Sequence, residues 1–274
     1  MTSNPPRTIL PGIAKPMIGM IHLKPLPGSA RYNGSFAEVR DAALADAEAL
    51  EAGGIDAIMI ENYGDVPFRK DAVEPHTVAM MSVIAAEIRR HCTKPLGINV
   101  LRNDPVAALA VAAACGAVMI RVNVHSGAMV TDQGIIEGNA RATLDYRMKL
   151  GADVKILADV HVKHAAPLAL LPIETAAADT VERGLADALI VSGERTGAGC
   201  DPRELRMVRA AVAAPVLIGS GLTPETAREL LAECDGAIVG SWLKERGEPG
   251  RPVDRERVAR LMETARGPGH DIAG

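Results

Sequence analysis

The stretch VKILADVHVK at residues 154–163 decides the fold. Its even-numbered positions are all apolar, whereas its odd-numbered positions are Lys155, Leu157, Asp159, His161 and Lys163. Successive side chains of a β-strand point to opposite faces. One face of this strand can therefore pack against helices, and the other carries polar groups inward. The pattern predicts a parallel strand whose apolar side meets a helical layer and whose polar side lines the interior of a barrel.

Seven other short runs rich in Val, Ile and Met accompany this strand. Each run is followed by a polar or Gly-rich loop and then by an Ala-rich amphipathic stretch, so one unit repeats eight times. This order predicts an α/β fold, and eight repeats favour closure into a (β/α)8 TIM barrel over an open doubly wound sheet, which stays open as the alternative. The predicted strands span residues 16–22, 56–61, 95–100, 117–122, 154–162, 187–192, 215–219 and 235–240.

A length of 274 residues suits one such barrel, so we expect residues 1–274 to form a single domain with flexible tails at 1–14 and 267–274. Helix starts follow the predicted strands. Ser35 with Glu38 forms a capping box, and a capping residue stands before proline at Asp104, Asp201 and Thr223.

Loop lengths differ between the two ends of the predicted barrel. The connections from helix to strand are short, whereas the strand-to-helix stretches 23–34, 62–75, 123–136 and 193–200 are long. All strand-to-helix loops of a TIM barrel open on one face, and that face holds the active site. Because the long loops lie on this side alone, they predict a functional site there.

Alternation on four neighbouring strands directs polar side chains toward one space at this face. We expect Glu61, Asp159, His161 and Lys163 to be the catalytic groups, because carboxylates, imidazole and amine can act as acids, bases or nucleophiles. We expect substrate contacts from four other residues: His22, Asn99, Arg121 and Asn123. A purely structural Arg121–Asp159 bridge is the alternative for that pair. His164 has the opposite parity to Lys163, which favours a structural role.

Two glycine-containing segments follow the seventh and eighth predicted strands. Gly219, Ser220 and Gly221 lead into one helix start, and Gly240 and Ser241 precede a possible short helical turn at 242–244. Glycine lets backbone N–H groups approach an anion closely, and the loops after strands seven and eight are the usual phosphate site of this barrel. These five residues are therefore the predicted phosphate-binding set.

Composition excludes several classes of function. A formal charge of −4 and 2% aromatic residues argue against a nucleic-acid-binding surface. No apolar run is long enough to span a bilayer, and the first residues lack the apolar core of a secretory signal. Cys92, Cys115, Cys200 and Cys234 are widely spaced, as in reduced thiols of a cytoplasmic protein. We therefore expect a cytoplasmic protein with no nucleic-acid partner and no integral membrane segment.

Five segments resemble the BtpA/SgcQ family: residues 15–30 (KPMIGMIHLKPLPGSA), 56–68 (DAIMIENYGDVPF), 158–165 (ADVHVKHA), 191–200 (VSGERTGAGC) and 215–226 (PVLIGSGLTPET). The resemblance runs from about residue 15 to 265. It implies a phosphate-binding TIM barrel of the ribulose-phosphate-binding type. One branch of the family is associated with photosystem I biogenesis and another with a sugar-utilisation gene cluster. The resemblance assigns no catalytic residue.

Three hypotheses for function follow. The first is an enzyme acting on a small phosphorylated metabolite, a sugar phosphate or nucleotide-related compound, by aldol, isomerase or epimerase chemistry with acid/base groups or Lys163. The second is metal-assisted hydrolysis with Glu61, Asp159 and His161 as ligands of a divalent metal; no cofactor is otherwise predicted. The third is a non-catalytic assembly or regulatory factor. Homo-oligomer formation is compatible with all three.

Overall fold

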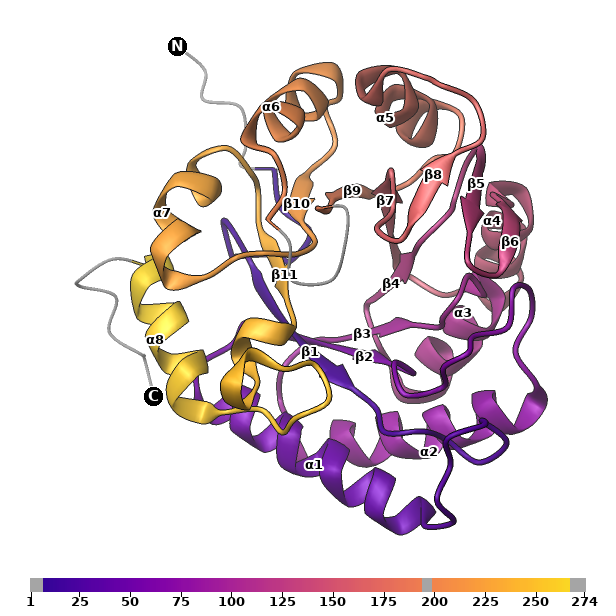
Figure 1. The fold of residues 1–274 in the computed structure, drawn as a ribbon, viewed down its shortest axis with the longest axis vertical. Helices are drawn as coiled ribbons and strands as arrows, with labels where there is room; N and C mark the ends of the chain where they lie inside the picture. The colour runs from indigo at the N-terminus through magenta and orange to yellow at the C-terminus, as the bar shows by residue number, and fades with distance from the viewer. Residues whose placement is uncertain (1–6, 194–198, 267–274) are drawn as a thin grey trace.

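The computed structural model describes residues 7–193 and 199–266, and its parallel strands form a closed eight-stranded barrel inside a ring of helices (Figure 1). This confirms the predicted TIM barrel and removes the open-sheet alternative. The strands lie in the order β1-β11-β10-β9-β7-β4-β3-β2. Their bounds are β1 Met17–His22, β2 Ala57–Glu61, β3 Leu96–Asn99, β4 Met119–Val122, β7 Lys155–Val160, β9 Ala188–Val191, β10 Val216–Ile218 and β11 Ala237–Val239.

Each barrel strand is followed by one α-helix of the outer ring. The predicted caps at Ser35, Asp104 and Asp201 accept hydrogen bonds from backbone N–H groups of the first helical turn, and Thr223 forms a capping box with Thr226. The helices are α1 Phe36–Ala52, α2 Pro75–His91, α3 Pro105–Cys115, α4 Ala140–Leu150, α5 Ile173–Glu182, α6 Pro202–Ala211, α7 Pro224–Ala232 and α8 Arg255–Arg266.

Strand alternation divides the apolar residues into two layers. Ile156 and Ala158 of β7 belong to the large core between barrel and helices, whereas Leu157 packs inside the barrel with Met59 and Met119. The inner layer is closed by Ile9 and Leu10, which are 7% and 4% exposed. This part of the expected tail 1–14 is therefore packed, because two apolar side chains gain more from covering the inner layer than from remaining in water. Residues 267–274 lie outside the described residues.

A small antiparallel sheet, which the sequence analysis did not predict, covers one side of the barrel mouth (Figure 1). Its strands are β5 Ala128–Thr131, β6 Gly134–Glu137 and β8 Ala165–Pro167, in the order β6-β5-β8. They come from the loops after β4 and β7, so these two loops are tied together by β5–β8 pairing. The sheet thereby positions the segment after β7 that carries Lys163.

The four cysteines are free and buried. No helix among the described residues has both the length and the apolar character needed to cross a membrane.

Candidate functional site

The strand register places four polar side chains in one row at the C-terminal ends of the first four barrel strands. His22 of β1 pairs with Glu61 of β2, Glu61 pairs with Asn99 of β3, and Asn99 pairs with Arg121 of β4. A cavity of about 720 Å³ opens above this row. Predicted site residues that line it are His22, Glu61, Arg121, Asn123, Lys163, Gly219, Ser220, Gly221, Gly240 and Ser241.

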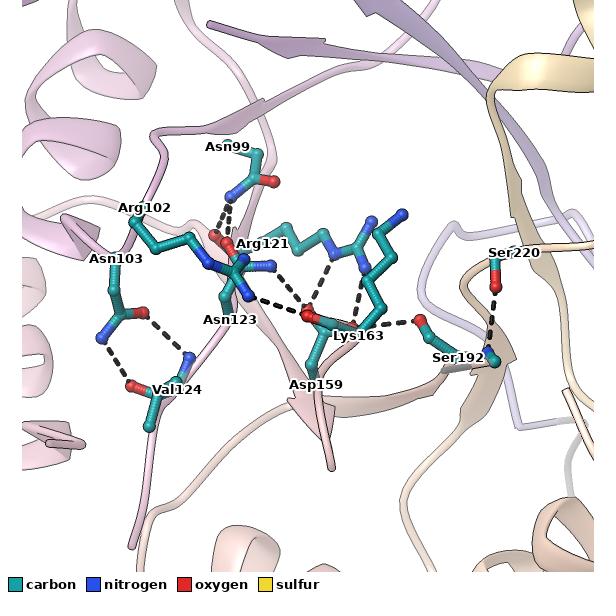
Figure 2. A network of polar contacts seen from close by, with 11 residues as sticks. Asn99, Arg102, Asn103, Arg121, Asn123, Val124, Asp159, Lys163, Ser192 and Ser220 are labelled. Atoms are coloured by element: carbon teal, nitrogen blue, oxygen red, sulfur yellow. Dashed lines mark hydrogen bonds and ion pairs between the residues drawn. The ribbon is translucent and has the colours of Figure 1, made fainter. Parts of the chain in front are cut away.

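The floor of the site is an ion pair between Arg121 and Asp159, drawn in Figure 2. Arg121 donates to both carboxylate oxygens, from Nε to Oδ2 at 2.9 Å and from Nη2 to Oδ1 at 2.7 Å. Both side chains are buried, at 2% and 0% exposure. Asn123 Nδ2 donates to Oδ2 at 3.0 Å, and Ser192 Oγ donates to Oδ1 at 3.3 Å. This network fixes the guanidinium plane below the cavity.

The catalytic role expected for Asp159 stays a prediction, and its contacts favour a positioning role. Its two oxygens already accept four hydrogen bonds, and Arg121 rather than Asp159 borders the large cavity. Asp159 therefore positions Arg121 and Asn123. The bridge named as the structural alternative is present, while Arg121 also keeps its expected place in the cavity wall.

His161 and Asn99 also lie elsewhere than expected. Strand β7 ends at Val160, and His161 has a left-handed φ of 52°, which ends the alternation and turns its side chain into a second cavity beside β8 and α5. Asn99 is 1% exposed and lies beneath the cavity, where its Nδ2 donates to Arg121 O at 3.1 Å and Asn123 Oδ1 at 3.2 Å.

Lys163 lines the large cavity, and so does His164, which we expected to be structural.

Three titratable side chains of the cavity have ionisation properties suited to catalysis. Burial, with the nearby positive charge of Arg121, lowers the pKa of Lys163 to about 8. Burial raises the pKa of Glu61, against the opposing effect of Lys163. Burial, reinforced by the positive charge of Lys244, lowers the pKa of His22 to about 3. The site thus holds an amine that loses its proton near physiological pH, a carboxyl that retains its proton more readily than usual, and a neutral imidazole.

The tautomer of His22 follows from its hydrogen bond. Its Nδ1 lies 3.1 Å from Pro249 O, and a carbonyl oxygen only accepts, so Nδ1 carries the hydrogen. Its Nε2 is then an acceptor, 3.9 Å from Glu61 Oε1. Because His22 is neutral, this contact is not an ion pair at neutral pH. A ligand donor, or a protonated Glu61 after a small movement, can satisfy Nε2.

Replacing Lys163 by methionine is expected to stabilise the protein by about 1–2 kcal/mol at neutral pH, because a cation is then no longer held in a poorly hydrated place. The folded-state pKa of about 8 lies below the ordinary 10.5. Between these values the folded protein holds fewer protons than the unfolded chain, so this lysine makes stability rise with pH. The methionine variant lacks that rise. The difference in free energy of unfolding between the two proteins is therefore largest below the folded-state pKa and disappears as pH approaches 10.5. Urea unfolding of both proteins at several pH values tests this; a pH-independent difference contradicts it.

The two glycine-serine segments line the same cavity at the ends of β10 and β11. Gly221 has a left-handed φ of 76°, and a Cβ on Gly240 would lie 3.0 Å from His22 Cε1. Ser220 Oγ accepts from Gly193 N at 3.0 Å, which ties the first segment to the loop after β9. The expected helical turn is present as a 3-10 helix, η1 Ser241–Leu243. Residues 194–198 of the long loop predicted at 193–200 lie outside the described residues.

Arg102 and Tyr63, which no sequence pattern singled out as site residues, also line the cavity. Arg102 follows β3, is 6% exposed, and donates from Nη2 to Lys163 O at 2.8 Å (Figure 2). It therefore joins the loops after β3 and β7 and adds positive charge. Both residues stand just beyond the predicted strands, where alternation no longer applies; their proximity to strand ends was the only available signal.

The ligand set of the metal hypothesis does not assemble. Glu61 borders the large cavity, His161 borders the second cavity, and Asp159 is occupied by Arg121. Across residues 7–193 and 199–266, no three His, Cys, Asp or Glu side chains come close enough together to form a metal site.

Fold and site together define a TIM barrel with a polar cavity at the C-terminal ends of its strands. The chain belongs to the BtpA family, whose model matches residues 13–267. It is 50% identical over 252 residues to an uncharacterized protein of Thermococcus kodakarensis, covering 92% of this chain and 95% of that one. It is 47% identical to the photosystem I biogenesis protein BtpA of Synechocystis (90% and 87% covered), and 34% identical to the putative sgc region protein SgcQ of Escherichia coli (92% and 94%).

Solved structures support the fold. The thiamine phosphate pyrophosphorylase of Pyrococcus furiosus superposes with a TM-score of 0.56 at 17% identity, covering 92% of this chain and 96% of that one. The N-(5'-phosphoribosyl)anthranilate isomerase of the same organism gives a TM-score of 0.56 at 15% identity, with 92% and 98% covered. At these identities the likeness concerns the architecture.

Proposed function

We propose that the protein is an enzyme of the lyase or isomerase type that acts on a small phosphorylated metabolite. One observation carries the proposal: Lys163, with its pKa lowered to about 8, and Glu61, with its pKa raised, border the same cavity as the glycine-serine segments after β10 and β11. The segments supply a place for the phosphate, and the two titratable groups supply proton transfer or nucleophilic attack.

Lys163, Glu61 and Arg121 each carry out a different part of the proposed reaction. The neutral fraction of Lys163 can attack a substrate carbonyl and form a Schiff base with loss of water, or it can take a proton from a carbon next to that carbonyl. Protonated Glu61 can donate a proton to the carbonyl oxygen, and Arg121, held flat by Asp159, stabilises negative charge that develops there. Binding of the phosphate orients the reacting end of the substrate over these groups.

Ligand binding at the glycine-serine segments is tested by thermal unfolding with ribose 5-phosphate or inorganic phosphate. A ligand at about 100 times its Kd stabilises the folded protein by about 2.7 kcal/mol. Ser241→Asp is expected to remove this response, because a carboxylate in the cradle repels the phosphate. Ser35→Asp is the matched control: Ser35 caps α1 outside the cavity, and aspartate is also a good cap. A response that survives in Ser241→Asp would place the phosphate elsewhere.

The nucleophilic role of Lys163 has its own test. Borohydride reduces a Schiff base to a stable amine, so mass spectrometry after incubation with a panel of phosphorylated aldehydes and ketones should find the adduct on Lys163. Lys163→Met should give none. If no adduct forms although ligands bind, the lysine acts in proton transfer and the aldolase version fails.

A second candidate is an assembly or regulatory factor, favoured by the name of the Synechocystis relative, a photosystem I biogenesis protein. It predicts a stable protein partner and no thermal response to phosphorylated metabolites. The buried charged groups around the cavity favour the enzyme, because their desolvation is offset when they bind or transform a ligand.

A further inference from the structure

Half of the aromatic side chains of this aromatic-poor chain lie at one cavity. The chain has one Trp, three Tyr and two Phe. Tyr63, Phe68 and Trp242 border the 720 Å³ cavity; Trp242 also packs against the main hydrophobic core, as do the other three aromatic residues, Tyr32, Phe36 and Tyr146. Aliphatic residues are abundant in this chain and fill its core. Packing of the main core therefore does not explain why the rings of Tyr63 and Phe68 stand at the site.

Tyr63 is held in place by its neighbours in the loop after β2. Asn62 is 1% exposed, accepts from Leu101 N at 2.7 Å and donates to Asp65 Oδ2 at 3.1 Å. Asp65 Oδ1 accepts from Leu26 N at 2.8 Å, and the backbone N–H of Gly64 donates to Leu23 O at 2.9 Å. The loop is thus tied to the segments after β1 and β3, so the position of the ring is set before a ligand arrives.

The imidazole of His22 contacts the ring of Tyr63 and also lies close to the predicted phosphate cradle. The Tyr63 ring stacks on His22 at a centroid distance of 4.5 Å and an interplanar angle of 26°. His22 also lies close to Gly240, where a Cβ would be 3.0 Å from His22 Cε1. Tyr63 and Gly240 are thus both neighbours of His22, and both border the same cavity.

Trp242 follows the cradle directly in sequence and is anchored by Arg257. The Arg257 guanidinium lies 4.4 Å from the centroid of the Trp242 ring, and its Nε donates to Trp242 O at 2.6 Å. On the loop after β2, Val66 and Phe68 continue the cavity wall from Tyr63, and Leu101 continues it after β3. This part of the wall is largely apolar, with Arg102 next to Leu101 as its charged member, whereas Glu61, Arg121 and Lys163 lie on the barrel strands and the loop after β7.

We infer that the ligand carries a planar heteroaromatic ring in addition to its phosphate, as a nucleoside monophosphate or another phosphoribosyl-linked ring does. The inference rests on the proposed function and narrows its substrate class. Aromatic side chains stack on flat rings and retain affinity for different rings, because each ring offers a π face. The acceptor Nε2 of His22 and the carboxyl of Glu61 then contact the polar edge of the ring or the linking sugar.

The test is isothermal titration calorimetry of the full chain with ribose 5-phosphate, adenosine 5′-monophosphate and cytidine 5′-monophosphate. The two nucleotides are expected to bind about 10- to 100-fold more tightly than ribose 5-phosphate, the range that stacking of one base provides. Tyr63→Leu should remove most of this difference, so that the nucleotides and ribose 5-phosphate bind with similar affinity, and Tyr63→Phe should retain the difference. Tyr146→Leu, an aromatic change outside the cavity, is the matched control.

The outcomes separate this inference from the proposed function. If ribose 5-phosphate binds and neither nucleotide binds more tightly, the ring is absent from the ligand and only the inference is overturned. If the gain for nucleotides survives in Tyr63→Leu, the ring lies elsewhere and the inference fails as well. If none of the three phosphorylated compounds binds, the proposed function itself is overturned. Hexyl phosphate, which carries an aliphatic chain in place of a ring, is titrated as a further comparison. If it binds as tightly as the nucleotides, the ligand is aliphatic and the inference is contradicted.

Discussion

Asp159→Ala is expected to lower the free energy of unfolding by about 3–5 kcal/mol, because it leaves the Arg121 guanidinium buried without its counter-charge. Arg121 is 3% exposed, and Asp159 supplies acceptors for its Nε and Nη2 as well as for Asn123 and Ser192. For a domain of this size, a loss of that magnitude lowers Tm by about 10 °C. Urea and thermal unfolding measure it, and any response to phosphorylated ligands should weaken because Arg121 is no longer oriented.

Two further variants separate charge from packing. Asp159→Asn keeps one carbonyl oxygen as an acceptor and should lose less stability than alanine. Arg121→Met combined with Asp159→Leu replaces the pair by apolar groups of similar size, so it should recover most of the loss, since a satisfied buried ion pair contributes little net stability. If the double variant is as unstable as Asp159→Ala, burial of an unpaired charge is not the cause. The ligand response should stay weakened in the double variant, which lacks the Arg121 guanidinium.

Asp46→Ala should lower the free energy of unfolding by a similar amount, about 3–5 kcal/mol, through a different buried charge. Lys244 is 0% exposed, and its Nζ lies 2.8 Å from Asp46 Oδ2 of α1. Asp46 Oδ1 also accepts from Val253 N at 2.7 Å. The pair therefore ties α1 to the segment just after Ser241. Without Asp46 the lysine must either lose its proton or become hydrated, and both outcomes cost free energy.

The matched control for this variant is an exposed ion pair. Arg141 and Asp145 lie one turn apart on α4 at 86% and 47% exposure, so Asp145→Ala should cost at most about 0.5 kcal/mol. The second comparison is Asp46→Ala combined with Lys244→Met, which removes the buried charge and should restore most of the stability. Equal losses in Asp46→Ala and Asp145→Ala would mean that burial of Lys244 does not decide its energetics.

Much of the barrel could be predicted because its signals are local. Alternation in VKILADVHVK, the eight short apolar runs and the capping residues each depend on neighbours a few positions away, and the structure confirms the strands and caps that they indicated. The sheet β6-β5-β8 was missed since its strands are three or four residues long and depend on pairing between two loops that are far apart in sequence.

The site was predicted in part for the same reason. Residues within the strands, such as Glu61 and Arg121, lie where alternation placed them. Alternation failed one residue past the end of β7, where the left-handed φ of His161 sends its side chain to another cavity. Arg102 and Tyr63 could not be singled out, because loop residues have no periodicity that predicts their direction.

The sequence by itself determined which side chains face inward along each strand and at which end of the barrel the long loops gather, because strand geometry and chain order set both. Only the tertiary structure decided which of the inward charged groups form ion pairs and in which direction their pKa values shift. Parallel register brings Arg121 close enough to form an ion pair with Asp159. Burial beside Arg121 lowers the pKa of Lys163, and burial beside Lys244 lowers the pKa of His22. Pairing and desolvation depend on distances between residues remote in sequence, so no local pattern encodes them.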